Sequence, residues 1–212
     1  MMLNQGNPYM RKLVIGLFSI SFLGPFASIG AALAAGANVS DVASIQKAAE
    51  RGDAQAQFKL GLEYAVGHGA VQKDYDKAKQ WYEKAAEQGF AEAQYKLSEM
   101  YRWGHQGVPK DYSKAVQWLE KAAAQGFALA QIDLGLMYYE GLGTQKDYCK
   151  AKLWFEKAAE QEVAITQYNL GLMYQNGTCV QKNYGKARQW YEKAAAQGVT
   201  QAQRNLDAIK SY

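Results

Sequence analysis

Cysteine and proline are both scarce in this 212-residue sequence, which contains two Cys and three Pro. Two cysteines are too few for a disulfide-rich scaffold, and by themselves they cannot complete a zinc site. A large excess of one charge is also missing, because 24 Lys and Arg residues are balanced by 20 Asp and Glu residues. A chain that is 49% hydrophobic with so small a net charge is not intrinsically disordered, so we expect a packed core.

The small basic excess argues against a nucleic-acid partner. The formal net charge is +4, and two of the basic residues, Arg11 and Lys12, precede every other charged residue in the chain. Without these two the excess falls to two. Nucleic-acid binding proteins concentrate far more basic charge on one surface.

The N-terminal segment has the order of features found in export signals. The basic pair precedes an apolar run from Leu13 to Phe26, and small residues follow. This order predicts a signal peptide over residues 1–37, cleaved after Ala34 or Ala37. We therefore expect an exported protein, periplasmic or secreted. The alternative is an uncleaved anchor in the inner membrane, because about 20 apolar residues span a bilayer; this segment would then be the only membrane contact that we predict.

Beyond this segment the sequence repeats itself every 36 or 37 residues. Five glutamines mark the period: Gln57, Gln94, Gln131, Gln167 and Gln203. A leucine follows each of them by three residues, and a tyrosine follows the first four by seven. Each unit then shows a glycine, an Asp-Tyr or Asn-Tyr pair, a tryptophan and a closing Lys-Ala-Ala. Self-similarity at such a period indicates a solenoid of stacked repeats.

Each unit is predicted to form two helices. In the first unit Gln57, Leu60 and Tyr64 recur at helical spacing, which predicts a helix over about 54–66. A glycine then supplies the left-handed residue that ends this helix; these glycines are Gly67, Gly104, Gly141 and Gly177. The residue predicted to cap the second helix is Asp74, Asp111, Asp147 or Asn183. The second helix stops at Gly89, Gly126, Glu162 or Gly198.

A column of small residues lies inside the first helix. It contains Gly61, Ser98, Gly135 and Gly171. Each glycine costs about 0.8–1 kcal/mol relative to alanine in a helix interior. We therefore expect the column to serve a close backbone approach between neighbouring helices, with Trp and Tyr rings filling the wider gaps.

The repeats make up one domain over residues 38–212. We count four units at about 50–86, 87–123, 124–159 and 160–195. Half-units at 38–49 and 196–212 are predicted to cap the two ends, because a lone repeat cannot bury its own apolar face.

The repeated residues resemble the Sel-1-like repeat, a relative of the tetratricopeptide repeat. The shared pattern is Ala-x-Ala-Gln-x-x-Leu-Gly-x-x-Tyr, followed by Asp-Tyr-x-Lys-Ala-x-x-Trp-Tyr-x-Lys-Ala-Ala-x-Gln-Gly. The resemblance implies an all-α fold, a right-handed α/α superhelix (solenoid) whose concave side is lined by the first helices. It also implies a role as an adaptor or scaffold in protein complexes, in a family whose bacterial members are often exported.

Residues that vary between units on the inner stripe of the first helix are the predicted partner-binding face. Fixed columns are explained by packing, whereas variable columns on one helical stripe are free to recognise a ligand. The candidates are Lys59, Glu92, Lys96, Glu99, Arg102, Trp103, Leu129, Asp133, Tyr139, Glu140, Asn169 and Asn176. The rest of the stripe is Gln55, Leu62, Ala65, Val66, Leu136, Ile165, Leu172 and Gln175. Trp103 and Tyr139 are the expected anchors for a protein or peptide ligand.

No catalytic, cofactor-binding or metal-binding residue is predicted. Ser44 and Lys47 match the Ser-x-x-Lys motif of penicillin-recognising enzymes, but the companion motifs are absent. Cysteine-rich relatives described as penicillin-binding proteins or β-lactamases make a cell-wall enzyme the alternative to a scaffold. His68 and His105 share a loop column in adjacent units, and we expect them to be solvated residues, too far apart to share a metal ion.

The two cysteines leave one question open. Cys149 falls at the start of a predicted second helix, and Cys179 in the loop of the next unit. In an exported protein they either form a disulfide or remain free thiols, depending on whether their Cα atoms come within about 7 Å.

Overall fold

The computed structural model describes residues 39–67, 71–104 and 107–209. These residues form ten helices and no β-strand, which confirms the all-α prediction. The helices are α3 (Val39–Glu50), α4 (Ala54–Val66), α5 (Tyr75–Glu87), α6 (Ala91–Trp103), α7 (Tyr112–Ala124), α8 (Ala128–Glu140), α9 (Tyr148–Glu160), α10 (Ala164–Asn176), α11 (Tyr184–Ala196) and α12 (Thr200–Ala208). The predicted signal peptide and the two loop histidines lie outside the described residues. None of the described helices is long and apolar enough to cross a membrane.

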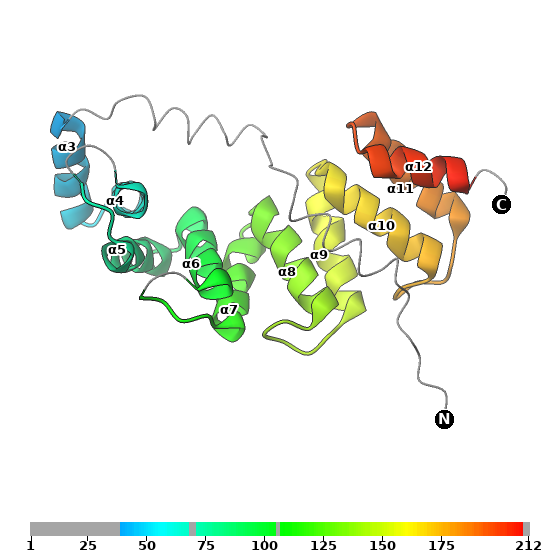
Figure 1. The fold of residues 1–212 in the computed structure, drawn as a ribbon, viewed down its shortest axis with the longest axis horizontal. Coiled ribbons are helices and arrows are strands. Elements are labelled where there is room, and N and C mark those ends of the chain that lie inside the picture. The colour runs from blue at the N-terminus through cyan, green and yellow to red at the C-terminus, as the bar shows by residue number, and fades with distance from the viewer. Residues whose placement is uncertain (1–38, 68–70, 105–106, 210–212) are drawn as a thin grey trace.

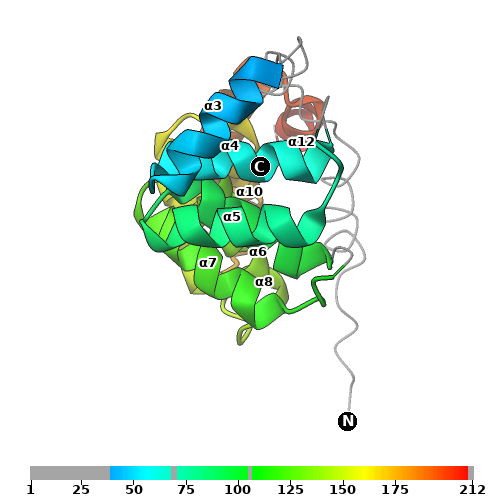
Figure 2. The same cartoon turned by 90° about the vertical axis from the view of Figure 1, so that its left-hand side faces the viewer.

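The helices stack as four hairpins between two single helices. α4–α5, α6–α7, α8–α9 and α10–α11 are the hairpins, and α3 and α12 cover the ends. Figure 1 shows that the stack bends into an arc that opens toward the top of the view, with α4 above α5 and α6 above α7. Figure 2 looks along the stack from its α3 end and shows α4 and α5 lying one below the other. The predicted solenoid is therefore confirmed, and in the α4–α5 and α6–α7 hairpins the first helix lies on the inner side of the curve.

Local hydrogen bonds explain where the helices begin and end. The Asp74 carboxylate accepts a hydrogen bond from the Lys77 backbone N–H at 2.9 Å, and Asp111, Asp147 and Asn183 cap the next second helices in the same way. The four glycines after the first helices all have positive φ, from 68° to 77°. The stops of the second helices are also left-handed, including Glu162 with φ of 60°. Glu162 thus adopts the left-handed backbone conformation, which costs a non-glycine residue about 1–2 kcal/mol.

The small-residue column accommodates an aromatic ring. A Cβ added to Gly61 would lie 2.6 Å from the ring of Tyr82, and Gly135 and Gly171 have the same relation to Phe155 and Tyr191. Each ring comes from the second helix of the same unit. The expected close approach is thus confirmed in part: the group that approaches most closely is a side-chain ring, and the expected backbone-to-backbone contact is not its main cause.

The fixed glutamines connect one repeat to the next. Gln57 Nε2 donates to the carbonyl of Ala49 at 3.1 Å, and Gln57 Oε1 accepts from Gln88 Nε2 at 2.7 Å. The same pair of bonds recurs at Gln94 and Gln131. These glutamines are about 5% exposed, so their amides are buried and hydrogen-bonded, as a buried polar group requires. The leucine column three residues later is fully buried and forms the centre of the core.

The two cysteines join the third and fourth repeats. A disulfide links Cys149, in the first turn of α9, to Cys179, in the loop after α10, with their Cα atoms 5.2 Å apart. One repeat earlier the same loop approaches the preceding second helix through Gly143, where an added Cβ would overlap the Tyr112 backbone. Cys179 keeps the left-handed backbone of this column, with φ of 57°. The disulfide therefore occupies the position at which, one repeat earlier, Gly143 packs closely against the backbone of Tyr112.

Candidate binding face

The structure divides the twelve predicted face residues into three groups by exposure. Lys59, Glu92, Trp103 and Asn176 are exposed. Lys96, Glu99, Leu129, Asp133, Tyr139 and Glu140 are partly buried, whereas Arg102 and Asn169 are buried. All twelve stay predicted residues of a partner-binding face, and in the described conformation two of them, Arg102 and Asn169, are not accessible from solvent. Arg102 is covered because its side chain pairs with Asp133 of the next first helix.

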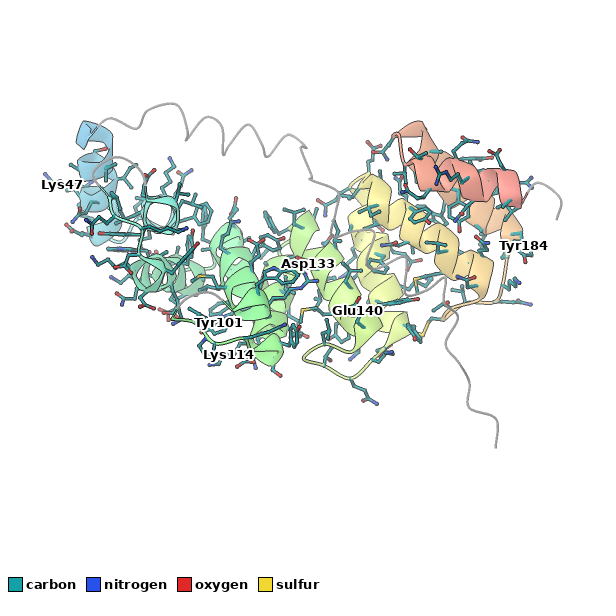
Figure 3. All side chains as sticks on the ribbon, viewed as in Figure 1. Lys47, Tyr101, Lys114, Asp133, Glu140 and Tyr184 are labelled. Carbon is teal, nitrogen blue, oxygen red and sulfur yellow. A yellow bond between two sulfur atoms is a disulfide. The ribbon has the colours of Figure 1, made fainter. Side chains whose placement is uncertain are left out.

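Arg102 holds the seam between α6 and α8. Its Nη1 lies 2.8 Å from Asp133 Oδ1, and the Tyr95 hydroxyl donates to Asp133 Oδ2 at 3.1 Å. The carboxylate therefore satisfies two donors from the preceding repeat, and burial together with this carboxylate raises the pKa of Tyr95. A buried pair of this kind fixes geometry more than it adds stability. Figure 3 shows Asp133 in the middle of the stack, between α6 and α8.

Trp103 is the most exposed aromatic side chain of this face, at 47%. The Arg102 guanidinium lies 4.9 Å from the centre of the Trp103 ring, in a cation–π arrangement. Because Asp133 fixes Arg102, the ring has a rigid support below it. A large, supported and accessible indole is the kind of side chain that anchors protein interfaces.

Two charged residues of α6, Glu99 and Lys96, lie four and seven residues before Trp103, which is helical spacing for one face. Lys96 and Glu99 form an ion pair with 2.8 Å between Nζ and Oε2, and both side chains remain about one third exposed. An exposed pair is worth at most about 1 kcal/mol, so a ligand can break it at little cost. Burial raises the pKa of the Glu140 carboxyl, with Arg102 and Lys146 opposing this effect.

Tyr139 is held mainly by packing. Its ring meets the edge of the Tyr148 ring, with centroids 4.9 Å apart, and burial raises the pKa of its hydroxyl. Sequence reasoning treated it as an anchor equal to Trp103. In the structure the Tyr139 side chain is partly buried, because the start of α9 covers one side of its ring.

Asn169 occupies the column of Asp133 one repeat later, but without its partners. It is 7% exposed, and its Nδ2 has no hydrogen-bond partner among the described residues. The Tyr95 column holds Ile132 here, which has no polar group to offer. The seam between α8 and α10 therefore lacks the polar closure seen between α6 and α8.

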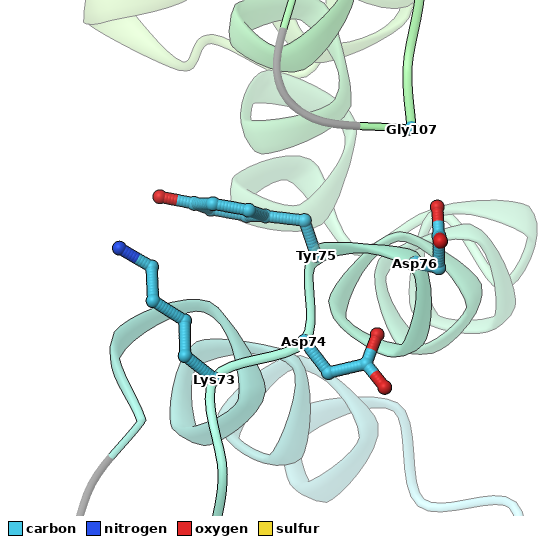
Figure 4. Close-up of a pocket in the computed structure, with 5 residues that line it drawn as sticks. All are labelled: Lys73, Asp74, Tyr75, Asp76 and Gly107. Carbon is cyan, nitrogen blue, oxygen red and sulfur yellow. The ribbon is translucent and has the colours of Figure 1, made fainter.

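One pocket was missed by sequence reasoning. It encloses about 300 Å³ and is lined by Lys73, Asp74, Tyr75, Asp76 and Gly107, where the second repeat's loop approaches the start of α5 (Figure 4). Only part of this signal was present in the sequence, because an Asp-Tyr or Asn-Tyr pair recurs in all four units, whereas the loop position of Gly107 holds Gly143 and then Cys179 in the next two units. The Lys73 ammonium lies 4.8 Å from the centre of the Tyr75 ring, so the pocket wall is already occupied by an internal contact.

Lysines cover tyrosines along the same edge of the array. Lys77 lies over Tyr64 and Lys114 over Tyr101, at 5.3 and 5.2 Å from the ring centres. Figure 3 shows the second pair at the lower edge of the molecule. The described residues contain no cluster of three or more side chains suited to bind a metal ion. Ser44 and Lys47 are both exposed on the terminal helix α3.

The stacked hairpins and their curved inner surface define an α-solenoid repeat protein. A model of the Sel1 repeat family matches four consecutive segments, residues 54–90, 91–127, 128–163 and 164–199. The chain therefore belongs to the Sel1 repeat family. The matched segments start at the first residue of each first helix, about four residues later than the units counted from the sequence, so the two descriptions differ in phase and agree in number.

Two crystal structures resemble this chain closely. One is a protective antigen present in uropathogenic Escherichia coli strains, 40% identical, with a TM-score of 0.75 over 79% of this chain and 36% of that protein. The other is a Sel1 repeat protein from Oxalobacter formigenes, also 40% identical, with a TM-score of 0.73 over 80% of this chain and 49% of that one. The chain thus spans less than half the length of either relative. No protein of curated function matched the sequence.

Membership has a general functional consequence. Sel1 repeat proteins mediate protein–protein interactions, and the family is typically non-catalytic.

Proposed function

We propose that this protein is a non-enzymatic adaptor of the bacterial envelope, periplasmic or secreted, that binds a polypeptide on its concave face. One observation carries the proposal. A single column of the inner stripe holds Lys59, Lys96, Asp133 and Asn169 in successive repeats, whereas the buried leucine column keeps one residue type. Such variation in charge and polarity along the inner stripe is what recognition of a non-repetitive ligand requires.

The exposed indole of Trp103 supports the same proposal. Its ring packs against the Arg102 guanidinium, and the Lys96–Glu99 ion pair lies on the same helix at helical spacing. An apolar anchor within a rim of both charges suits a polypeptide better than a polyanion, which would require basic charge alone.

Two features support export. The order of basic, apolar and small residues over 1–37 is that of a signal peptide. The Cys149–Cys179 disulfide is a bond that persists in oxidising compartments. Mass measurement of the mature protein tests the first point, because cleavage after Ala34 or Ala37 removes a defined mass.

The test of binding compares two variants with matched exposure. Trp103→Ala removes a 47% exposed ring from the inner helix α6, and Leu153→Ala removes a 49% exposed side chain from the outer helix α9. Each protein is used to capture partners from envelope extract, followed by mass spectrometry. We expect a polypeptide that wild type and Leu153→Ala retain and Trp103→Ala loses. Retention by Trp103→Ala, or loss with both variants, would contradict the proposal.

The cell-wall enzyme is the less supported alternative. Its Ser44 and Lys47 lie exposed on the end helix α3, and the companion motifs of penicillin-recognising enzymes are absent from the sequence. Turnover of a β-lactam by the purified protein would favour it over the adaptor.

A further inference from the structure

The outer stripe of α9 differs from the same stripe of the other second helices. Cys149 and Leu153 are both exposed and lie four positions apart, so they share one face of the helix. In the other repeats these two columns hold polar residues or glycine, in the pairs Asp76 and Gln80, Ser113 and Gln117, and Gly185 and Gln189. Leu153 is 49% exposed, and the neighbouring Tyr148 is 38% exposed. In the third repeat an exposed cysteine therefore lies beside exposed apolar side chains.

Packing at the Cys149 position does not require a covalent bond. Between the second and third repeats the Ser113 hydroxyl donates to the Gly143 carbonyl at 3.4 Å. Between the first and second repeats a Cβ added to Gly107 would overlap the Asp76 carboxylate, so that contact is also close. Cys179 keeps the left-handed backbone of this glycine column, with φ of 57°, which is unfavourable for a non-glycine residue. Cysteine at this position is therefore explained by the bond that it forms and not by packing.

The disulfide lies at the boundary between two core clusters. The larger cluster extends from α5 to Leu170 and Met173 of α10. The second joins Tyr168 of α10 to buried residues of α11 and α12, and α11 reaches the larger cluster through the partly buried Trp190. Cys179 lies in the loop between α10 and α11, and its bond ties this loop back to α9. Because a repeat is stabilised by its immediate neighbours, the bond helps to hold the last two helices, at one end of the arc in Figure 1, to the rest of the array.

We propose that the Cys149–Cys179 disulfide is a thiol-exchange site, at which a dithiol protein docks on Leu153 and reduces the bond, and that reduction releases α11 and α12 from the array. The site lies on the outer helix α9, so the inference goes beyond the proposed binding of a polypeptide on the inner face and does not depend on it. The partner presents a reactive dithiol beside an apolar contact surface, because the exposed side chains next to the bond are apolar.

The exchange balances between the two proteins. A thiolate of the partner attacks the sulfur of Cys149, the more exposed of the two cysteines, and the electron pair of the S–S bond leaves on Cys179, which takes up a proton. The partner's second thiolate then attacks its own first sulfur in the mixed disulfide. Cys149 leaves as a thiolate and is protonated. The partner is thereby oxidised to a disulfide, and this chain receives two electrons and two protons.

The first experiment separates docking from chemistry. The oxidised full chain is reduced without denaturant, either by reduced thioredoxin, a dithiol protein, or by dithiothreitol, a dithiol without a protein surface, and the free thiols are alkylated and counted by mass spectrometry. Leu153→Gln installs the residue of the other repeats. We expect this change to slow reduction by thioredoxin about 10-fold, the value of burying part of a leucine side chain, and to leave the rate with dithiothreitol unchanged.

The control for this experiment is Gln80→Ala, in the same exposed column two repeats earlier, which should change neither rate. A bond that resists thioredoxin in the folded chain overturns the proposal. So does a Leu153→Gln variant that is reduced as fast as wild type by thioredoxin, or that slows equally with both reductants.

The second experiment measures what reduction does to the array. Hydrogen exchange of the oxidised and the reduced full chain is compared by mass spectrometry. We expect reduction to remove protection over residues 184–208, in α11 and α12, and to preserve it over residues 54–103. Cys149→Ser with Cys179→Gly closes the boundary without sulfur, so its exchange should not respond to dithiothreitol. Equal protection in both redox states, or a loss spread evenly over all repeats, overturns the proposal.

Discussion

Removal of the Cys149–Cys179 disulfide tests how the third and fourth repeats are held together. The bond closes a segment with a sequence separation of 30 residues. The loop-closure entropy of such a segment corresponds to about 3.6 kcal/mol of stability at 25 °C. For a domain of this size that is a loss of about 7–14 °C in Tm. We therefore expect Cys149→Ser with Cys179→Ser to melt lower than the oxidised wild type by that amount.

A second variant separates the stabilisation by the disulfide from the energetic cost of the left-handed loop backbone. Cys149→Ser with Cys179→Gly recreates the Ser113–Gly143 pair found at this contact between the second and third repeats. Cys179 has φ of 57°, which costs a non-glycine residue about 1–2 kcal/mol. The glycine variant should therefore be more stable than the serine variant by about that amount and still less stable than wild type.

Thermal unfolding followed by circular dichroism gives the three melting temperatures. A free-thiol assay under denaturing conditions accompanies it, and we expect no titratable thiol in the wild type. Two thiols would show that the bridge is absent. If the thiols are absent but all three proteins melt within a degree or two of one another, the bond does not constrain this boundary and the reasoning is refuted.

Two further predictions concern ring packing and pH. Gly171→Ser should destabilise the protein by about 1–3 kcal/mol, because its Cβ would lie 2.5 Å from the ring of Tyr191. Adding Tyr191→Leu recreates the Ser98–Leu119 pair of the second unit and should recover part of the lost stability, measured by urea unfolding. No recovery would contradict the account. Burial raises the pKa of Tyr138 to about 12 from its usual value of 10.0, so the folded state holds this proton more tightly. Its contribution to stability is complete below pH 10 and is lost as the pH rises through about 12; a Tm that stays constant over this range would show that the hydroxyl is not perturbed.

Repeat columns made most of the fold predictable from sequence. Asp74 caps its helix and Gly67 ends the one before it through contacts within a few residues, so local chemistry was sufficient. The glycine column was harder. Gly135 indicated a close approach, but the approaching group is Phe155, and its identity depends on how one helix lies against the other.

The binding face was less predictable because exposure depends on the neighbouring repeat. Arg102 and Asn169 fall on the variable stripe, yet both are buried, Arg102 through its ion pair with Asp133 of the next first helix. Asp133 has a partner across its seam and Asn169 has none, a difference set by residues more than 30 positions away in the sequence. The distance between Cys149 and Cys179 also depends on how two repeats stack, and for that reason the sequence left the disulfide open.

Site-specific photo-crosslinking in cells tests the inner-face account most directly. A photoreactive residue is placed at Lys59 or Glu92, exposed on the first helices, and in separate proteins at Gln80 or Gln117, exposed on the second helices. We expect the inner positions to yield adducts with the same polypeptide and the outer positions to yield none. Adducts from the outer positions alone would place recognition on the opposite surface and contradict the account.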